Sequence, residues 1–142
     1  MATNEELIGV WSADAMYGPG GQSDDVLVFK PDGTGYFEFS NFAPCWAEFF
    51  IWSVESPSVL SLQGLRVMTI TDDATKLVEE ESDLSAAVPF SIAVEYTKSQ
   101  REMPVLRFAR RPWPLNSDHF GFRGKDFSKF EQPDFSWVHS AG

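Results

Sequence analysis

The sequence is short of the residues from which disulfides and metal centres are built. It contains one cysteine, Cys45, and two histidines, His119 and His139. A lone cysteine excludes an intrachain disulfide, and Cys45 has no basic neighbour to favour a reactive thiolate, so we expect a buried thiol. A zinc site needs three or four converging ligands, which the spacing of the histidines does not supply. We therefore expect neither a metal nor a cofactor.

Positive charge is also scarce. The 142 residues include 11 Lys and Arg against 21 Asp and Glu, which gives a formal net charge of -10. Nucleic acid and anionic membrane surfaces repel such a chain, so we expect neither as a partner. No apolar run is long enough to span a membrane, and the N-terminal stretch MATNEELIGVW carries acids where a signal peptide carries basic residues. These features predict a cytoplasmic protein.

The common catalytic motifs are missing as well. The sequence has no Ser-His-Asp order and no dinucleotide fingerprint, and GPGG at 18–21 lacks the preceding strand and following helix of a phosphate loop. Asp118 beside His119 would suit acid–base chemistry, but a solvated loop pair is the favoured interpretation. The acidic run EEES at 79–82 is typical of a solvated outer face.

Strand signals, by contrast, recur along the whole chain. The clearest is VLVFKPDGTGYFEFS (26–40), in which two apolar-rich arms flank Pro31-Asp32-Gly33, a turn where Pro fixes φ and Gly accepts a positive φ. Further strands are expected at about 7–13, 47–55, 58–71 with a kink at Gly64, 76–82, 88–97 and 103–111. Because nearly every connection is short enough for a hairpin, we predict an all-β fold, an up-and-down antiparallel barrel of about eight strands.

Phenylalanine and tryptophan are what the sequence has in abundance, with 13 and 5 residues. Many lie in an irregular tail at 112–142, where such large apolar side chains are not expected to remain in water. We predict a single domain, 1–142, with the barrel at about 7–111 and the tail either wrapped on the barrel or forming a homodimer interface. We expect any helix to be confined to short pieces, either near the N-terminus or within 115–132.

Three motifs follow one another over about residues 7–62. LIGVWS (7–12) resembles the Gly-x-Trp signature that opens lipocalin and calycin barrels. LVFKPDGTGYF (27–37) is similar to the DGTG hairpin of bacterial lipocalin-like domains, and FFIWSVESPSVLSL (49–62) resembles their next unit, an aromatic-x-Trp strand, a short turn and an L-x-L strand. The order and spacing of these motifs resemble those of a bacterial lipocalin-like domain of the calycin superfamily.

The resemblance implies that the barrel binds a small, mostly apolar molecule. In the family, the Trp of the first strand closes the base of the barrel, and a basic residue from the last strand packs across it. Trp11 matches this Trp, and Arg107, with Arg110 second, is the candidate for its partner. The sequence lacks the signal peptide and disulfides of the secreted members, and its aromatic tail has no counterpart among them.

One set of aromatic residues would line the barrel if it has a cavity, or fill it as ordinary core if it has none. These candidate ligand-binding residues are Phe29, Phe37, Phe39, Phe50, Trp52, Phe90 and Phe108.

Two other functions stay open. The chain could be an enzyme that folds a reactive apolar substrate in the barrel, such as a cofactor-independent cyclase or isomerase of natural-product biosynthesis. Its acid or base would then be Tyr96, Glu38 or Glu95, although we predict that these side chains point outward, as Tyr36 does. Alternatively, a filled barrel could serve as an interaction protein, with the aromatic tail as its working part.

Overall fold

A computed structural model describes residues 4–16, 23–41, 43–55, 58–71, 76–112 and 118–135. Within these stretches 65% of the residues lie in strands, and helix is limited to one short α-helix and one 3-10 helix. No helix among the described residues is long and apolar enough to cross a membrane. The elements, in chain order, are α1 (Asn4–Leu7), β1 (Gly9–Ser12), the 3-10 helix η1 (Asp14–Met16), β2 (Ser23–Phe29), β3 (Thr34–Asn41), β4 (Ala43–Glu55), β5 (Val59–Ile70), β6 (Leu77–Glu81), β7 (Ser85–Tyr96), β8 (Glu102–Phe108) and β9 (His119–Gly124).

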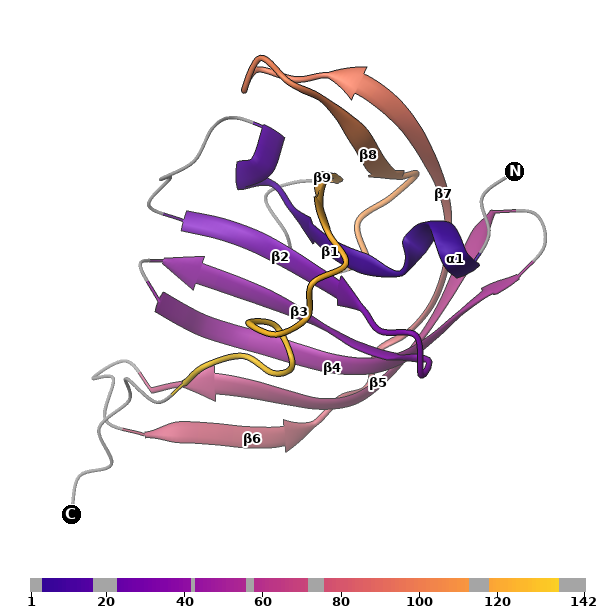
Figure 1. The fold of residues 1–142 in the computed structure, drawn as a ribbon. Helices are drawn as coiled ribbons and strands as arrows, with labels where there is room; N and C mark the ends of the chain where they lie inside the picture. The colour runs from indigo at the N-terminus through magenta and orange to yellow at the C-terminus, as the bar shows by residue number, and fades with distance from the viewer. Residues whose placement is uncertain are drawn as a thin grey trace.

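The strands form one antiparallel sheet that closes on itself (Figure 1). Each strand from β1 to β5 pairs with the next along the chain, β5 pairs with β7, and β7, β8 and β9 continue in order until β9 pairs with β1. The result is a ring of eight strands, with β6 added beside the second half of β5. The predicted all-β, up-and-down barrel of about eight strands is confirmed.

The opening hairpin is formed by β2 and β3 as the sequence predicts. Lys30 N–H donates to the carbonyl of Thr34, and Gly33 adopts a φ of 85°. The Asp32 carboxylate accepts hydrogen bonds from the backbone N–H and the hydroxyl of Thr34, at 2.9 and 2.6 Å. These local bonds fix the register of the two strands, so that Leu27 lies opposite Phe37 on the inner face of the barrel.

β5 has two successive partners along one edge. Its first half, Val59–Gln63, pairs with β7, and its second half, Arg66–Ile70, pairs with β6. Gly64 lies at the junction, where its N–H donates to the carbonyl of Leu84 at 2.8 Å. A Cβ at Gly64 would lie only 1.9 Å from Ser82 Oγ, so the close approach of the β6–β7 connection requires glycine there.

The last strand of the ring lies in the segment that we expected to be an irregular tail. β9 pairs with both β8 and β1, so the described residues 118–132 contain a strand and no helix, and the barrel extends past residue 111. The run HFGFRG hides this strand because two glycines interrupt the apolar alternation. Gly121 is required by packing, since a Cβ there would lie 2.6 Å from Met103 Sδ.

The described part of the tail after β9 packs on the outside of the barrel. Phe127 and Phe130 lie against an outer cluster formed by Val10, Val26, Val28 and Tyr36. The Tyr36 hydroxyl donates to the carbonyl of Phe130 at 3.0 Å. The described part of the tail thus packs on the barrel as far as Phe135, which is one of the two arrangements that we expected. Residues 136–142 lie outside the described residues.

Candidate functional site

One end of the barrel, which we call the base, is closed by α1 and by tightly packed rings. This is the end at which α1 and the β2–β3 turn lie (Figure 1). Leu7 of α1 is fully buried in the main core, and its carbonyl accepts a hydrogen bond from Trp11 Nε1 at 2.9 Å. The ring of Phe122, from β9, meets the Trp11 ring edge-on with centroids 4.9 Å apart. Trp11 therefore closes the base as the resemblance implied.

The predicted partner of Trp11 is wrong. Arg107 does not stack on the indole, because it lies on the outer face of β8 and forms two hydrogen bonds with Glu95. Arg110, the second candidate, donates to the carbonyl of Ala87. The residue from the last strand that packs on Trp11 is the aromatic Phe122, which contributes dispersion and an edge-to-face contact in place of a cation–π contact.

All seven candidate ligand-binding residues lie in or against one core cluster. Six of them are buried, and Phe39 is half-buried and packs against the same cluster. Near the base their rings touch one another: Phe29 lies 5.7 Å from Phe50 and 5.3 Å from Trp52 between centroids. Trp52 also donates from Nε1 to the carbonyl of Thr34, so its ring is fixed. This half of the interior is packed as ordinary core.

Burial of the inward-facing apolar side chains on β3, β4 and β5 decreases toward the opposite end of the barrel, which we call the open end. On β5, Leu60 and Leu62 are buried, whereas Val67 is half-buried. Phe37 of β3 is fully buried, but Phe39 beside the open end is only half-buried, as is its cross-strand partner Trp46 on β4. Large aromatic side chains thus face the interior without being completely covered by the chain itself.

Two acidic side chains also face the interior, and the sequence analysis did not identify them. Asp25 lies on the same face of β2 as Leu27 and Phe29, and it is opposite Phe39 on β3. Glu48 lies opposite Phe37, on the face of β4 that also carries Phe50. Their exposed fractions are 5% and 6%. The sequence could have revealed them, because each is an acidic residue at a position that strand alternation assigns to the apolar, inward face.

Glu48 has a defined neighbour within the barrel. Its Oε2 accepts a hydrogen bond from Ser82 Oγ at 2.6 Å, and the same Ser82 Oγ accepts one from the N–H of Leu84 at 3.1 Å. The tight approach at Gly64 therefore places Ser82 where it can hold Glu48.

The three candidate catalytic residues do not form one site, although Glu95 and Tyr96 both line a small cavity beside the β7–β8 hairpin. Tyr96 lies near the tip of the β7–β8 hairpin and is 70% exposed. It shares the inner face of β7 with Phe90, so our prediction that it points outward is wrong. Glu38 faces outward and is buried beneath the tail, where burial raises the pKa of its carboxyl. Glu95 also faces outward, and its pKa is lowered chiefly by the hydrogen bonds from Arg107.

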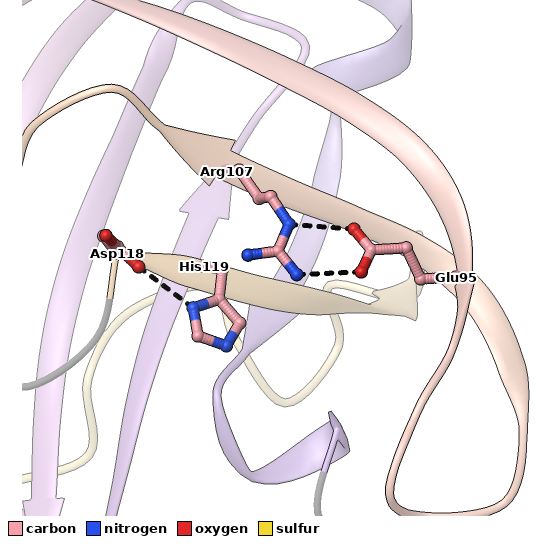
Figure 2. Close-up of polar contacts among 4 residues, drawn as sticks. All are labelled: Glu95, Arg107, Asp118 and His119. Carbon is pink, nitrogen blue, oxygen red and sulfur yellow. Dashed lines mark hydrogen bonds and ion pairs between the residues drawn. The ribbon is translucent and has the colours of Figure 1, made fainter.

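Figure 2 shows the polar cluster to which Glu95 belongs. The Arg107 guanidinium donates through Nε and Nη2 to the two Glu95 oxygens at 2.9 and 2.8 Å. On the neighbouring strand, His119 Nδ1 lies 3.0 Å from Asp118 Oδ1, a contact that lowers the pKa of the Asp118 carboxyl. The Arg107–Glu95 ion pair joins β7 and β8, and the His119–Asp118 contact is local to the start of β9. The adjoining cavity of about 140 Å³ is small for an organic ligand, so the cluster is best explained as structural.

Metal-binding and thiol chemistry receive no support from the described residues. They contain no group of three or more His, Cys, Asp or Glu that could hold a metal ion. Cys45 is half-buried, which is more exposed than the buried thiol that we expected. His139 lies outside the described residues.

Comparisons of this chain with models of known protein families, with curated proteins and with solved structures found no match. The fold is nevertheless consistent with a calycin-like barrel, because the sheet closes as a ring of eight antiparallel strands.

Proposed function

We propose that this protein binds a small, mostly apolar molecule in the open half of a lipocalin-like barrel. One observation carries the proposal: Phe39 and Trp46 face the barrel interior, yet they are only half-buried, while the rings nearer the base are packed against one another. Half-covered aromatic side chains that face the inside of a barrel offer an apolar surface that the protein has not already used for its own core.

Asp25 and Glu48 would give the ligand its orientation. Ligand sites are mostly apolar and contain a small number of placed polar groups. Both carboxylates are buried, and β3, which carries Phe37 and Phe39, lies between their two strands. A ligand that stacks on these rings and presents a hydrogen-bond donor could reach one of the acids.

The family relationship is part of the same proposal. The order of the Gly-x-Trp, DGTG and aromatic-x-Trp motifs resembles that of bacterial lipocalin-like domains. The placement of Trp11 at a base closed by α1 supports the resemblance, as does the closure of the sheet into eight strands.

The enzyme hypothesis would need a different set of acids from the one first considered. Glu95 and Tyr96 line one small cavity, but Glu38 does not line it, so no common substrate would reach all three. Asp25 and Glu48 are the acids that a substrate inside the barrel would meet. We therefore keep a cyclase or isomerase as the alternative, with these two carboxylates as its acid and base.

The test is a titration with N-phenyl-1-naphthylamine, a neutral apolar dye that fluoresces more strongly in apolar surroundings. We expect a saturable increase in dye emission with wild-type protein and quenching of tryptophan fluorescence, because Trp46 lies beside the site. Phe39→Ala should weaken dye binding about tenfold or more, since it removes one wall of the site.

The matched control is Phe130→Ala, which removes the same ring from the outer cluster. This variant should bind the dye as the wild type does. If the wild type gives no saturable signal, or if both variants bind as well as the wild type, the proposed function is wrong.

A further inference from the structure

A cavity of about 230 Å³ lies where η1 meets the tip of the β7–β8 hairpin (Figure 1). We call this cavity the arginine pocket, because two of the side chains that line it are arginines. None of its described lining residues is among the candidate ligand-binding residues of the barrel. Its volume is below the range of sites for drug-sized molecules, so it suits a small ion or one group of a larger molecule. The polar side chains and the methionine of its lining are Ser12, Asp14, Ser99, Arg101, Met103 and Arg123.

Hydrogen bonds and apolar packing fix the two walls of the arginine pocket relative to each other. Ser99 N–H donates to the carbonyl of Met16 at 2.9 Å, which ties the hairpin tip to η1. Met16 and Met103 are buried in one cluster below this contact. At the hairpin tip, the carbonyl of Arg101 accepts hydrogen bonds from the N–H and the hydroxyl of Thr97, at 2.9 and 3.0 Å. The backbone that carries these side chains is therefore held in place by the fold itself.

The two arginines of the pocket are unusual in a chain that has 11 Lys and Arg against 21 Asp and Glu. Arg66 and Arg107 each form an ion pair with a glutamate, but Arg101 and Arg123 form none with any carboxylate of the described stretches. The guanidinium carbon of Arg123 lies 5.4 Å from the centroid of the Phe130 ring. This contact steadies the side chain and leaves its charge without a counter-ion.

Two acidic side chains lie near these arginines. Asp14 lines the pocket with them, and Asp24 lies behind Asp14, whose N–H donates to it at 2.9 Å. Burial raises the pKa of the Asp24 carboxyl to about 6, and the charge of Arg123 opposes this increase. At this pH the two arginines therefore exceed the negative charge of Asp14 and of the partly protonated Asp24. The balance favours an anion in the pocket.

We propose that the arginine pocket binds a phosphate group that retains a proton. Each guanidinium offers several N–H donors in a planar fork, which suits the oxygens of a phosphate. The Asp14 carboxylate only accepts hydrogen bonds, so it would repel sulfate, whose oxygens are also only acceptors. It would accept a hydrogen bond from the O–H of a protonated phosphate. Arg101 and Arg123 thus provide affinity for anions, and Asp14 selects among them, whether or not the barrel binds the ligand proposed above.

The experiment titrates the full-length chain with inorganic phosphate, glycerol 2-phosphate and sulfate, at constant ionic strength and at about pH 6, where Asp24 is partly protonated. The methionine methyl groups are labelled with ¹³C. Met103 lines the pocket and reports binding, whereas Met68 of β5 does not line it and serves as the internal reference. The Met103 signal is assigned with Met103→Leu. Binding of both phosphates would support a phosphate group of a larger molecule as the ligand, and binding of inorganic phosphate alone would support the free ion.

We expect inorganic phosphate to shift the Met103 signal saturably and to bind about fivefold more tightly than sulfate, although sulfate carries the higher charge at this pH. Arg101→Gln and Arg123→Gln should each weaken phosphate binding about tenfold, as loss of a charge-assisted hydrogen bond predicts. Asp14→Asn should remove the preference for phosphate over sulfate. The matched control is Arg66→Gln, which removes the same charge outside the pocket and should change binding by less than about twofold, because salt screens distant charges.

Three results would overturn the proposal. The first is the absence of a saturable Met103 shift with either phosphate. The second is sulfate that binds the wild type as tightly as inorganic phosphate does, since Asp14 would then select nothing. The third is an Arg66→Gln variant that loses as much affinity as Arg101→Gln and Arg123→Gln, because binding would then reflect the charge of the whole molecule rather than this pocket.

Discussion

Asp24 and Asp25 are neighbours in the chain, yet strand alternation gives their carboxylates different surroundings. Asp25 faces the barrel interior, whereas Asp24 faces outward beside η1 and accepts a hydrogen bond from the N–H of Asp14 at 2.9 Å. Burial is the main reason that the pKa of Asp24 is raised to about 6, and the nearby Asp14 carboxylate adds to it. This group therefore links the stability of the η1 region to pH.

The sign of the linkage follows from the raised pKa. In the unfolded chain Asp24 loses its proton near pH 4, but in the folded protein it keeps the proton until about pH 6. Its contribution to stability is thus fully present below pH 4 and is lost as pH rises to 6, by up to about 3 kcal/mol. Asp24→Asn should remove this loss.

The measurement is the free energy of unfolding of wild type and Asp24→Asn at pH 4 and pH 7, from urea titrations. The variant should gain stability relative to wild type between the two values. Exposed Asp126, whose pKa is lowered by hydrogen bonds from Ser128, provides the control: Asp126→Asn should show no such gain. A constant difference between Asp24→Asn and wild type across this range would contradict the assignment.

Trp11 is the residue on which closure of the base depends. It is fully buried, it donates to Leu7, and it packs against Phe122. Trp11→Ala should cost about 3–5 kcal/mol, because it removes a large buried ring and leaves a cavity. Chemical denaturation would measure this loss. Dye affinity in the molecules that remain folded should be unchanged, since Trp11 lies at the base, and near-wild-type stability would show that the base is not closed as described.

At the scale of elements, the predictable parts are those fixed by local chemistry. The β2–β3 hairpin was predicted correctly because the Pro-Asp-Gly turn and the alternation on both sides of it specify a register. β9 was missed because Gly121 and Gly124 interrupt the alternation of apolar residues. Position 121 requires glycine because it packs against Met103, which is distant in the sequence. Long-range packing of this kind leaves no periodic signal in the chain.

The candidate site was predictable in part for the same reason. The inward aromatic residues follow from strand alternation, and all seven lie in or against the core cluster. Whether a ring such as Phe29 or Phe39 is packed or half-exposed depends on how the strands close into a barrel, which no single strand specifies. The predicted contact between Arg107 and Trp11 failed because it assumed that β8 was the last strand.

Gly64 marks the point on β5 where its pairing partner changes from β7 to β6, and a substitution there tests this close packing. Gly64→Ala would place a methyl group against Ser82, which holds Glu48. We expect a loss of about 1–3 kcal/mol in the free energy of unfolding, typical of overpacking, measured by urea titration. Adding Ser82→Gly should restore part of this stability, because it removes the two nearest atoms. Full tolerance of Gly64→Ala would contradict the close approach.

At the scale of the whole molecule, the barrel has a packed base and a less covered open end, and the described tail is bound to its outer face. Core clusters lie on both sides of the sheet: the main one fills the interior, and the outer one is completed by Phe127 and Phe130. Closure of the ring removes the edges of its eight strands, and the packed base supplies stability. The open end is where we propose that a ligand binds.

The most direct test of this account compares Phe29→Ala with Phe39→Ala by urea unfolding without ligand. Both changes remove the same ring from the inner face, one at the base and one at the open end. Phe29→Ala should cost about 3–5 kcal/mol, because its ring is fully buried among Phe50 and Trp52. Phe39→Ala should cost less than half of that, because its ring is only half-buried. Equal losses in the two variants would show that the interior is filled from end to end and would contradict the account.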